Sequence, residues 1–138
     1  MNSSFSKNSN LFQIYISDAE EALPPSLLPC RDLFMDQFEN YDYHLFNKSA
    51  LREFVASNFD SDVLAVYDAL VPYAYKADLG RYCLLYVYGG WYADITLRPT
   101  ISGKVPLLGD VEIVYFHDYG NGPYQSSYHV QNGFMYVK

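Results

Sequence analysis

The feature that most constrains the fold is a pair of glycines, Gly89 and Gly90, between two segments of different periodicity. Residues 73–88 before the pair are mostly compatible with a helix, whereas residues 91–97 after it alternate apolar and polar side chains as a strand does. Glycine accepts the positive φ that ends a helix in a sharp turn. The sequence therefore predicts a helix that turns directly into a strand at this point.

Charged and polar side chains stand on both sides of this turn. On the helix, Asp78 and Arg81 are three residues apart and share a face, so each can hold the other in place. On the strand, we expect Asp94 and Thr96 to point to one face, close to that helix. Ligands of α/β sheets bind in crevices beyond strand ends, and paired oxygens there suit a hard cation that bridges a diphosphate.

The rest of the sequence predicts strands and helices in alternation. We expect strands at 11–16, 41–46, 111–116 and 133–137, helices capped by Ser26, Ser49 and Ser61, and a loop over 117–131. Strands interleaved with helices indicate an α/β domain of three layers. We expect residues 1–10, which are polar, to form a flexible N-terminal arm, and residues 11–138 to form the single domain.

Composition excludes several classes of function. The net charge of −7 repels phosphate backbones, so we expect no nucleic-acid partner, and an anionic small molecule needs a local cation or a metal. No apolar run is long enough for a transmembrane segment, and the sequence predicts a soluble, cytoplasmic protein. Cys30 and Cys83 are expected to be buried free thiols, with a disulfide as the alternative.

The stretch from residue 77 to residue 94 resembles the DXD-motif sugar transferases, glycosyltransferase family thirty-two, which includes capsular-polysaccharide and initiating-mannosyltransferase types. The matching positions of the family pattern are Ala77-Asp78, Arg81-Tyr82, Leu85-Tyr86, Gly89-Gly90, Tyr92 and Asp94. Weaker similarities flank this run. They lie at 12–16, 41–46 and 131–135, so the resemblance covers most of the chain from Leu11 onward.

This resemblance implies a GT-A-like (Rossmann-like) three-layer sandwich that binds a nucleotide-diphosphate sugar and transfers the sugar to a hydroxyl acceptor with retention of configuration. The acceptor would be a glycan, a polysaccharide or a lipid-linked sugar. Asp78 and Arg81 would contact the donor sugar, Arg81 also the phosphates, and Asp94 the ribose, the sugar or a Mn²⁺ or Mg²⁺ ion. The remaining nucleotide-sugar contacts implied by the family are Gln13, Ile14, Tyr15, Gly90, Tyr92 and Asn132.

Two departures from the family pattern bear on activity. Thr96 stands where the motif has its second acid; its hydroxyl can ligate Mg²⁺ or Mn²⁺ but is a weaker ligand than a carboxylate. The chain ends at Lys138, inside an expected strand, whereas the family continues further, so we expect a fold that is incomplete at its C-terminal end.

Other interpretations stay open. The fold can serve as a catalytically weak or inactive nucleotide-sugar-binding module, which Thr96 and the early end favour. A glycoside hydrolase with paired carboxylates, Asp94 and Asp118, is a third hypothesis. His117 with Asp118 is more typical of a solvated loop than of an acid/base pair, and Asp78 with Arg81, outside the motif, would be a helix-surface pair. Peripheral contact with a membrane and the oligomeric state are not decided by the sequence.

Overall fold

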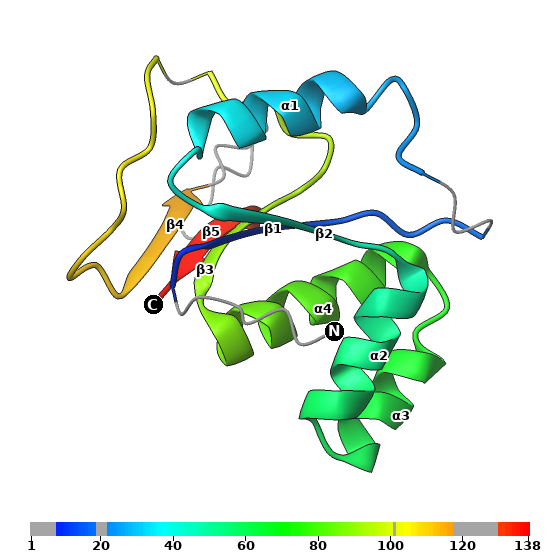
Figure 1. Cartoon of the computed structure of the whole chain (residues 1–138). Helices are drawn as coiled ribbons and strands as arrows, with labels where there is room; N and C mark the ends of the chain where they lie inside the picture. Colours follow the sequence, from blue (N-terminus) through cyan, green and yellow to red (C-terminus); the bar gives the residue numbers. More distant parts are fainter. Residues whose placement is uncertain (1–7, 19–21, 101, 118–129) are drawn as a thin grey trace, which may run out of the picture.

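The computed structural model describes residues 8–18, 22–100, 102–117 and 130–138 (Figure 1). Helices and strands follow one another along the chain as β1 (Asn10–Ile14), α1 (Leu28–Gln37), β2 (Asp42–Phe46), α2 (Lys48–Asn58), α3 (Ser61–Ala69), α4 (Tyr73–Tyr88), β3 (Gly90–Ala93), β4 (Ile113–His117) and β5 (Val130–Val137). The predicted α/β class is therefore confirmed.

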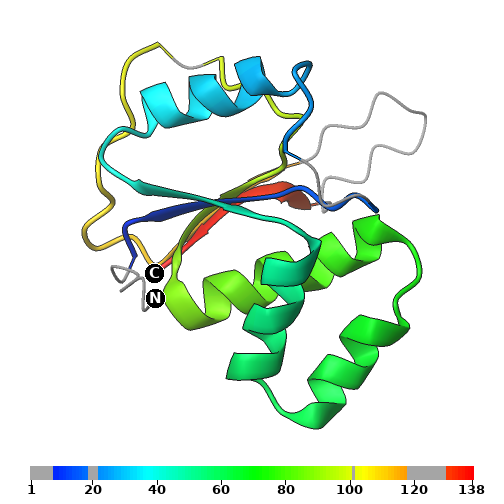
Figure 2. The same cartoon turned by 45° about the vertical axis from the view of Figure 1, so that its right-hand side comes forward.

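The strands form one mixed sheet in the order β2-β1-β3-β5-β4. β1 is parallel to both β2 and β3, so the carboxyl ends of these three strands meet at one edge of the sheet. β5 is antiparallel to both β3 and β4, so its first residues lie at that same edge. α1 covers one face of the sheet, and α2, α3 and α4 cover the other (Figures 1 and 2), which gives the three expected layers.

Each face of the sheet has its own apolar core, because side chains alternate between the faces along a strand. On the α1 side, Leu11 and Trp91 pack with Phe34 of α1 and with Phe38 directly after it. On the α4 side, Phe12 and Tyr92 pack with residues of α2, α3 and α4. Adjacent residues of β1 and β3 thus belong to opposite cores.

The glycine pair adopts the predicted turn. Gly89 ends α4 with a φ of 64° and Gly90 opens β3 with a φ of 106°. A Cβ on Gly90 would lie 2.4 Å from the carbonyl oxygen of Asn10, so only glycine lets β3 approach β1 this closely. The helix-to-strand turn that the sequence predicted is confirmed.

Several predicted boundaries were wrong. The strand expected over residues 91–97 ends at Ala93, and the Leu97 amide donates to the Asp94 carbonyl over 3.0 Å to close a turn. Alternation continues past the strand because Ile95 is buried within that turn. Thr96 consequently lies in the turn and not on a strand face with Asp94.

The predicted caps were also shifted. Asn47 and Asp60, not Ser49 and Ser61, accept the first backbone amides of α2 and α3. α1 begins after Leu27 without a side-chain cap, so Ser26 does not cap it. Asparagine, aspartate and serine cap helices about equally well, so a run of such residues leaves the capping position ambiguous.

The other expectations have mixed outcomes. β5 begins at Val130, three residues before the strand expected at 133, and β4 includes His117. Asn10 is already in β1, while residues 1–7 of the expected arm lie outside the described part. Cys30 and Cys83 are buried free thiols, as predicted. Among the described residues, no helix is both long and apolar enough to cross a bilayer.

Candidate functional site

The Arg81 guanidinium lies at the centre of a polar cluster between α4 and the carboxyl end of β3. Its Nη2 is 2.7 Å from Oδ1 of Asp78, and its Nη1 is 3.3 Å from Oδ1 of Asp94. Nη1 also donates to the Asn132 carbonyl over 2.8 Å, and Nε donates to the Ala77 carbonyl over 3.3 Å. Every guanidinium nitrogen of Arg81 therefore faces a protein oxygen, and this side chain holds the cluster together.

The three charged side chains of the cluster differ in how far they are buried. The Arg81 side chain is only 5% exposed, whereas those of Asp78 and Asp94 are 42% and 38% exposed. The guanidinium thus forms the floor and the two carboxylates form the rim. Two carboxylates against one guanidinium leave the described cluster net negative. Such a site favours hydroxyl donors, and it repels phosphate unless a cation enters.

Asp94 is fixed by contacts on three sides. Its backbone N–H donates to the Gly133 carbonyl of β5 over 2.7 Å, directly after the end of β3. The Tyr92 hydroxyl donates to its Oδ1 over 2.8 Å. A Cβ on Gly133 would lie 2.5 Å from its Oδ2, so glycine at this position makes room for the carboxylate. These contacts set the orientation of the Asp94 side chain.

Tyr92 supports the site from below. Its ring is 1% exposed and lies under the Arg81 guanidinium, with 4.7 Å between Cζ and the ring centroid. Burial raises the pKa of the Tyr92 hydroxyl, and Asp94 beside it adds to the rise, so the hydroxyl stays protonated and donates. Tyr92 contacts the two residues that line the site, Arg81 and Asp94, and its predicted contact with the nucleotide sugar stays a prediction.

A bulge in β5 brings Asn132 to the cluster. Tyr115 pairs with Met135, but the next residue, Phe116, pairs with Gln131, so residues 132–134 lie outside the β4–β5 register. The Asn132 carbonyl faces Arg81, and its side-chain amide donates to Oδ1 of Asp78 over 3.4 Å. Asn132 thereby joins α4 to β5 at the site.

The residues predicted at the end of β1 contribute unequally. The Gln13 side chain is fully buried and donates to the Asp94 carbonyl over 3.4 Å, while the Tyr43 hydroxyl donates to Gln13 over 3.0 Å. Ile14 packs in the α4-side core. Tyr15 is half-buried just beyond the strand, and its amide donates to the Phe46 carbonyl. Of these three residues, Gln13 is the one that forms a hydrogen bond with Asp94.

Two predicted site residues are not brought to the cluster. Gly90 is the first residue of β3, at the opposite end of the strand from Asp94, and contacts the Asn10 backbone. Thr96 is exposed, and its carbonyl accepts a 4.0 Å contact from Cys30 of α1, on the other face of the sheet. The expectation of a paired Asp94–Thr96 strand face was wrong because the strand ends before Asp94.

Of the two residues predicted to hold a divalent cation, Asp94 and Thr96, Asp94 lies in the cluster and supplies a carboxylate. The described residues contain no group of three His, Cys, Asp or Glu side chains that could hold a metal ion. Arg81 and Tyr92 both contact Oδ1 of Asp94, whereas its Oδ2 lies beside Gly133. This donor set fits Mg²⁺ or Mn²⁺ when phosphate oxygens of a ligand complete the coordination. Asp118, the proposed hydrolase partner, lies outside the described residues.

Sequence reasoning missed Gly133 and the carbonyl of Asn132. Gly133 directly follows Asn132 and is the first residue of the predicted strand 133–137, and a glycine in a strand is a signal for a bulge or a close backbone approach. That signal could have placed Gly133 near a functional group. No sequence pattern could have identified the Asn132 carbonyl, because every residue has a backbone carbonyl.

The family model described as "Glycosyltransferase sugar-binding region containing DXD motif" matches residues 26–102. An uncharacterized glycosyltransferase of Acanthamoeba polyphaga mimivirus is 29% identical over 87 residues, which are 63% of this chain and 34% of that protein. Inositol phosphoceramide mannosyltransferase 3 of Schizosaccharomyces pombe is 32% identical over 73 residues, 53% of this chain and 20% of that protein.

The chain thus spans well under two thirds of the curated relatives that it matches. No solved structure gives a significant match. The family match includes Asp78, Arg81 and Asp94, whereas Asn132 and Gly133 lie beyond its last residue.

Proposed function

Because the chain belongs to the family of glycosyltransferases whose sugar-binding region contains the DXD motif, we propose that it binds a nucleotide-diphosphate sugar on a GT-A-like domain and transfers the sugar to a hydroxyl acceptor. The observation that supports this most is the contact of Arg81 with both Asp78 and Asp94 at the carboxyl end of β3. Ligands of α/β sheets bind at this edge.

The transfer itself is a substitution at the anomeric carbon of the donor. The bond between that carbon and the diphosphate oxygen breaks, and its electron pair stays on the leaving diphosphate. The acceptor hydroxyl oxygen forms the new bond to the anomeric carbon, and its proton passes to the released diphosphate. We propose retention of configuration, so the acceptor oxygen ends on the face that the diphosphate left.

The proposed roles follow from the charges of the cluster. The exposed rim carboxylates, Asp78 and Asp94, accept hydrogen bonds from donor hydroxyls, and Asn132 beside Asp78 offers its amide to the same sugar. Arg81 holds both carboxylates in register and offsets part of their charge. Preorganised contacts of this kind need no rearrangement during the reaction, which is how electrostatic catalysis lowers a barrier.

The nucleotide is proposed to lie along the carboxyl end of β1, near Gln13 and Tyr15. β1 and β3 are parallel neighbours, so this end adjoins Asp94, and Gln13 already bonds to the Asp94 carbonyl. Tyr15 is half-buried there and offers a ring to a base.

The metal is part of the proposal. Mn²⁺ or Mg²⁺, held by Asp94 together with phosphate oxygens of the donor, would neutralise charge on the leaving diphosphate. Since the described cluster is net negative, we expect nucleoside diphosphates to bind weakly without the cation. Titration of UDP and GDP with Mn²⁺ and with a chelator measures this; equal affinity in both would remove the cation from the proposal.

The acceptor is proposed only by its chemistry, a hydroxyl of a glycan, a polysaccharide or a lipid-linked sugar. One relative is named as an inositol phosphoceramide mannosyltransferase, and this name describes the relative and not this chain. Incubation with a panel of UDP- and GDP-sugars, with release of free nucleoside diphosphate as the readout, tests turnover. We expect release with one donor and a loss of at least about tenfold in Asp94→Asn.

A second candidate, a nucleotide-sugar-binding module with little or no turnover, is favoured by Thr96. The motif's second acid is absent at this position, and the structure places Thr96 in a turn. The module predicts a rise in melting temperature with a nucleotide sugar but no release of nucleoside diphosphate. The transferase predicts both, so the two measurements together distinguish them.

A further inference from the structure

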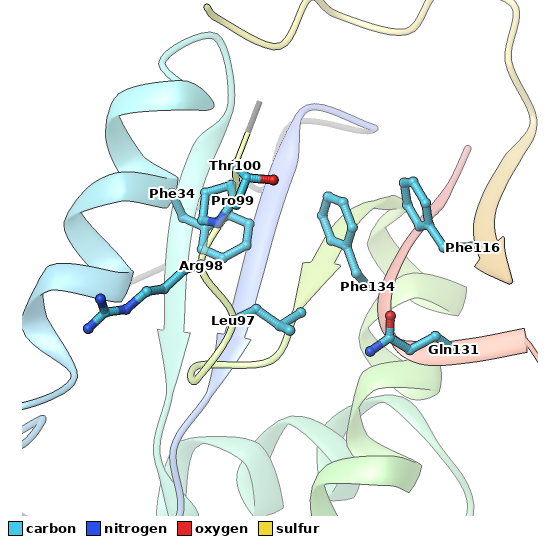
Figure 3. Close-up of a pocket in the computed structure, with 8 residues that line it drawn as sticks. All are labelled: Phe34, Leu97, Arg98, Pro99, Thr100, Phe116, Gln131 and Phe134. Carbon is cyan, nitrogen blue, oxygen red and sulfur yellow. The ribbon is translucent and has the colours of Figure 1, made fainter. Parts of the chain in front are cut away.

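A second hollow adjoins the donor site on the opposite face of the sheet (Figure 3). Its volume is about 250 Å³, and it is lined by Phe34, Leu97, Arg98, Pro99, Thr100, Phe116, Gln131 and Phe134. Phe34 belongs to α1, which covers the sheet face away from Arg81. The hollow is therefore separate from the Asp78–Arg81 cluster.

Two short connections join the hollow to the donor site. Asp94 and Leu97 are the first and last residues of one turn, and Leu97 lines the hollow. Gln131 and Asn132 are adjacent in β5; Gln131 lines the hollow, whereas the Asn132 amide reaches Asp78. The two places are thus joined through the turn after β3 and through adjacent residues of β5.

Aromatic rings line the hollow, and Phe116 is the one among them that is exposed. Trp91, Phe134 and Phe116 form a row, with centroids 4.9 Å apart between the first two and 5.0 Å between the last two, at interplanar angles of 20° and 13°. Phe134 is thus stacked on both faces, and Phe116, which ends the row and is 41% exposed, is the ring with an outer face for a ligand. Figure 3 shows Phe116 and Phe134 on one side of the hollow, with Phe34 and Pro99 on the other.

The polar groups of the hollow are few and mostly neutral. Gln131 supplies an amide and Thr100 a hydroxyl, and each can both donate and accept. Arg98 lines the rim, and its guanidinium points away from the centre in Figure 3. Apolar walls with a few polar groups are typical of small-ligand sites.

This lining matches a pyranose ring. A hexopyranoside has C–H faces that suit the electron-rich faces of aromatic rings, and a rim of hydroxyls that suits an amide and a hydroxyl. We propose that the hollow binds a neutral hexopyranosyl unit of the acceptor, which rests on the proposed glycosyl transfer. A hydroxyl of this unit would be the nucleophile, and its proton would leave with the diphosphate.

Saturation-transfer-difference NMR on the full chain tests this with methyl α-D-mannopyranoside, glucopyranoside and galactopyranoside. Ligands of this size give dissociation constants on the order of 1 mM. We expect saturation transfer to at least one glycoside, a loss of most of it in Phe116→Ala and in Gln131→Leu, and no change in Tyr115→Ala. Tyr115 is the matched control because it is the exposed neighbour of Phe116 in β4 and lines a different groove.

Asp94→Asn separates the hollow from the donor site. If the glycoside occupies the hollow, its signal persists in Asp94→Asn and falls in Phe116→Ala. Three results would overturn the proposal. They are a signal that falls in Asp94→Asn and persists in Phe116→Ala, equal signals in all variants, and no signal from any glycoside. UDP and GDP titrations of the same samples report on the proposed function independently: nucleotide binding that fails while glycoside binding persists rejects the donor site and leaves the hollow standing.

Discussion

Gly133 and Asp94 are held against each other where β3 and β5 separate. The Asp94 amide donates to the Gly133 carbonyl over 2.7 Å, and a Cβ on Gly133 would reach within 2.5 Å of Asp94 Oδ2. A backbone position on a late strand thus decides the orientation of the carboxylate at the centre of the proposed site.

Gly133→Ala is expected to displace the Asp94 side chain and to destabilise the fold by about 1–3 kcal/mol, because backbone and carboxylate must both shift. Binding of the nucleotide sugar should fall as well. Gly109→Ala is the matched control, since a Cβ there meets nothing within 4 Å. Urea denaturation and donor titration measure the two effects; a Gly133→Ala protein that binds as Gly109→Ala does would show that this contact is unimportant.

Tyr92→Phe removes the hydroxyl that donates to Asp94 and keeps the ring under Arg81. We expect a loss of about 1–2 kcal/mol in the free energy of unfolding and weaker donor binding. Tyr41→Phe is the control, because the Tyr41 hydroxyl also donates over 2.8 Å, to the Pro106 carbonyl, away from the site. Equal stability losses with a binding defect in Tyr92→Phe alone support the account. A binding defect of the same size in both variants would contradict it.

Arg81→Met keeps much of the buried stem and removes the guanidinium. It leaves the Asn132 and Ala77 carbonyls without their donor and both rim carboxylates without their cation, so we expect a loss of about 2–3 kcal/mol. Arg52→Met should cost less than about 1 kcal/mol, since the Arg52–Asp68 pair is exposed. Chemical denaturation of the two variants measures the difference, and similar midpoints would show that Arg81 does not organise the cluster.

His44 predicts a pH dependence of stability. Burial lowers the pKa of His44 below its ordinary value of 6.5, and the nearby Asp42 charge opposes this only in part. The unfolded chain therefore binds a proton at higher pH than the folded chain. This contribution to stability is complete above pH 6.5 and is lost as the pH falls from there through the folded pKa.

Melting temperatures of the wild type and His44→Gln between neutral and mildly acidic pH test this. The wild type should lose more stability over that range than the variant, since glutamine does not titrate. Parallel curves for the two proteins would show that His44 titrates alike in the folded and unfolded states.

The parts of the site that the sequence predicted are local in the chain. Asp78 and Arg81 share a helix face through their spacing, and the glycine turn returns Asp94 to that face within the same run. Helical periodicity, a helix-ending glycine and strand alternation each give a sequence signal. Together they were enough to place Asp94 close to the helix that carries Arg81, although the strand itself ends at Ala93.

The remaining parts depend on pairing between distant segments. The bulge that turns the Asn132 carbonyl toward Arg81 exists only in the register of β4 against β5. The turn after Asp94 was missed because alternation over residues 91–97 fits a strand and also fits a turn that buries Ile95. The pairing of distant strands decides between the strand and the turn, and a local sequence pattern does not determine the register of that pairing.

The central claim is that the Asp94 carboxylate, held beside Arg81, forms the site for a nucleotide-diphosphate sugar. Calorimetric titration of UDP- and GDP-sugars in the presence of Mn²⁺, with the wild type and Asp94→Asn, tests it most directly. The account predicts saturable binding of at least one donor to the wild type and a loss of affinity of at least about tenfold in the variant. Absence of binding to every donor, or equal affinity in both proteins, would contradict it.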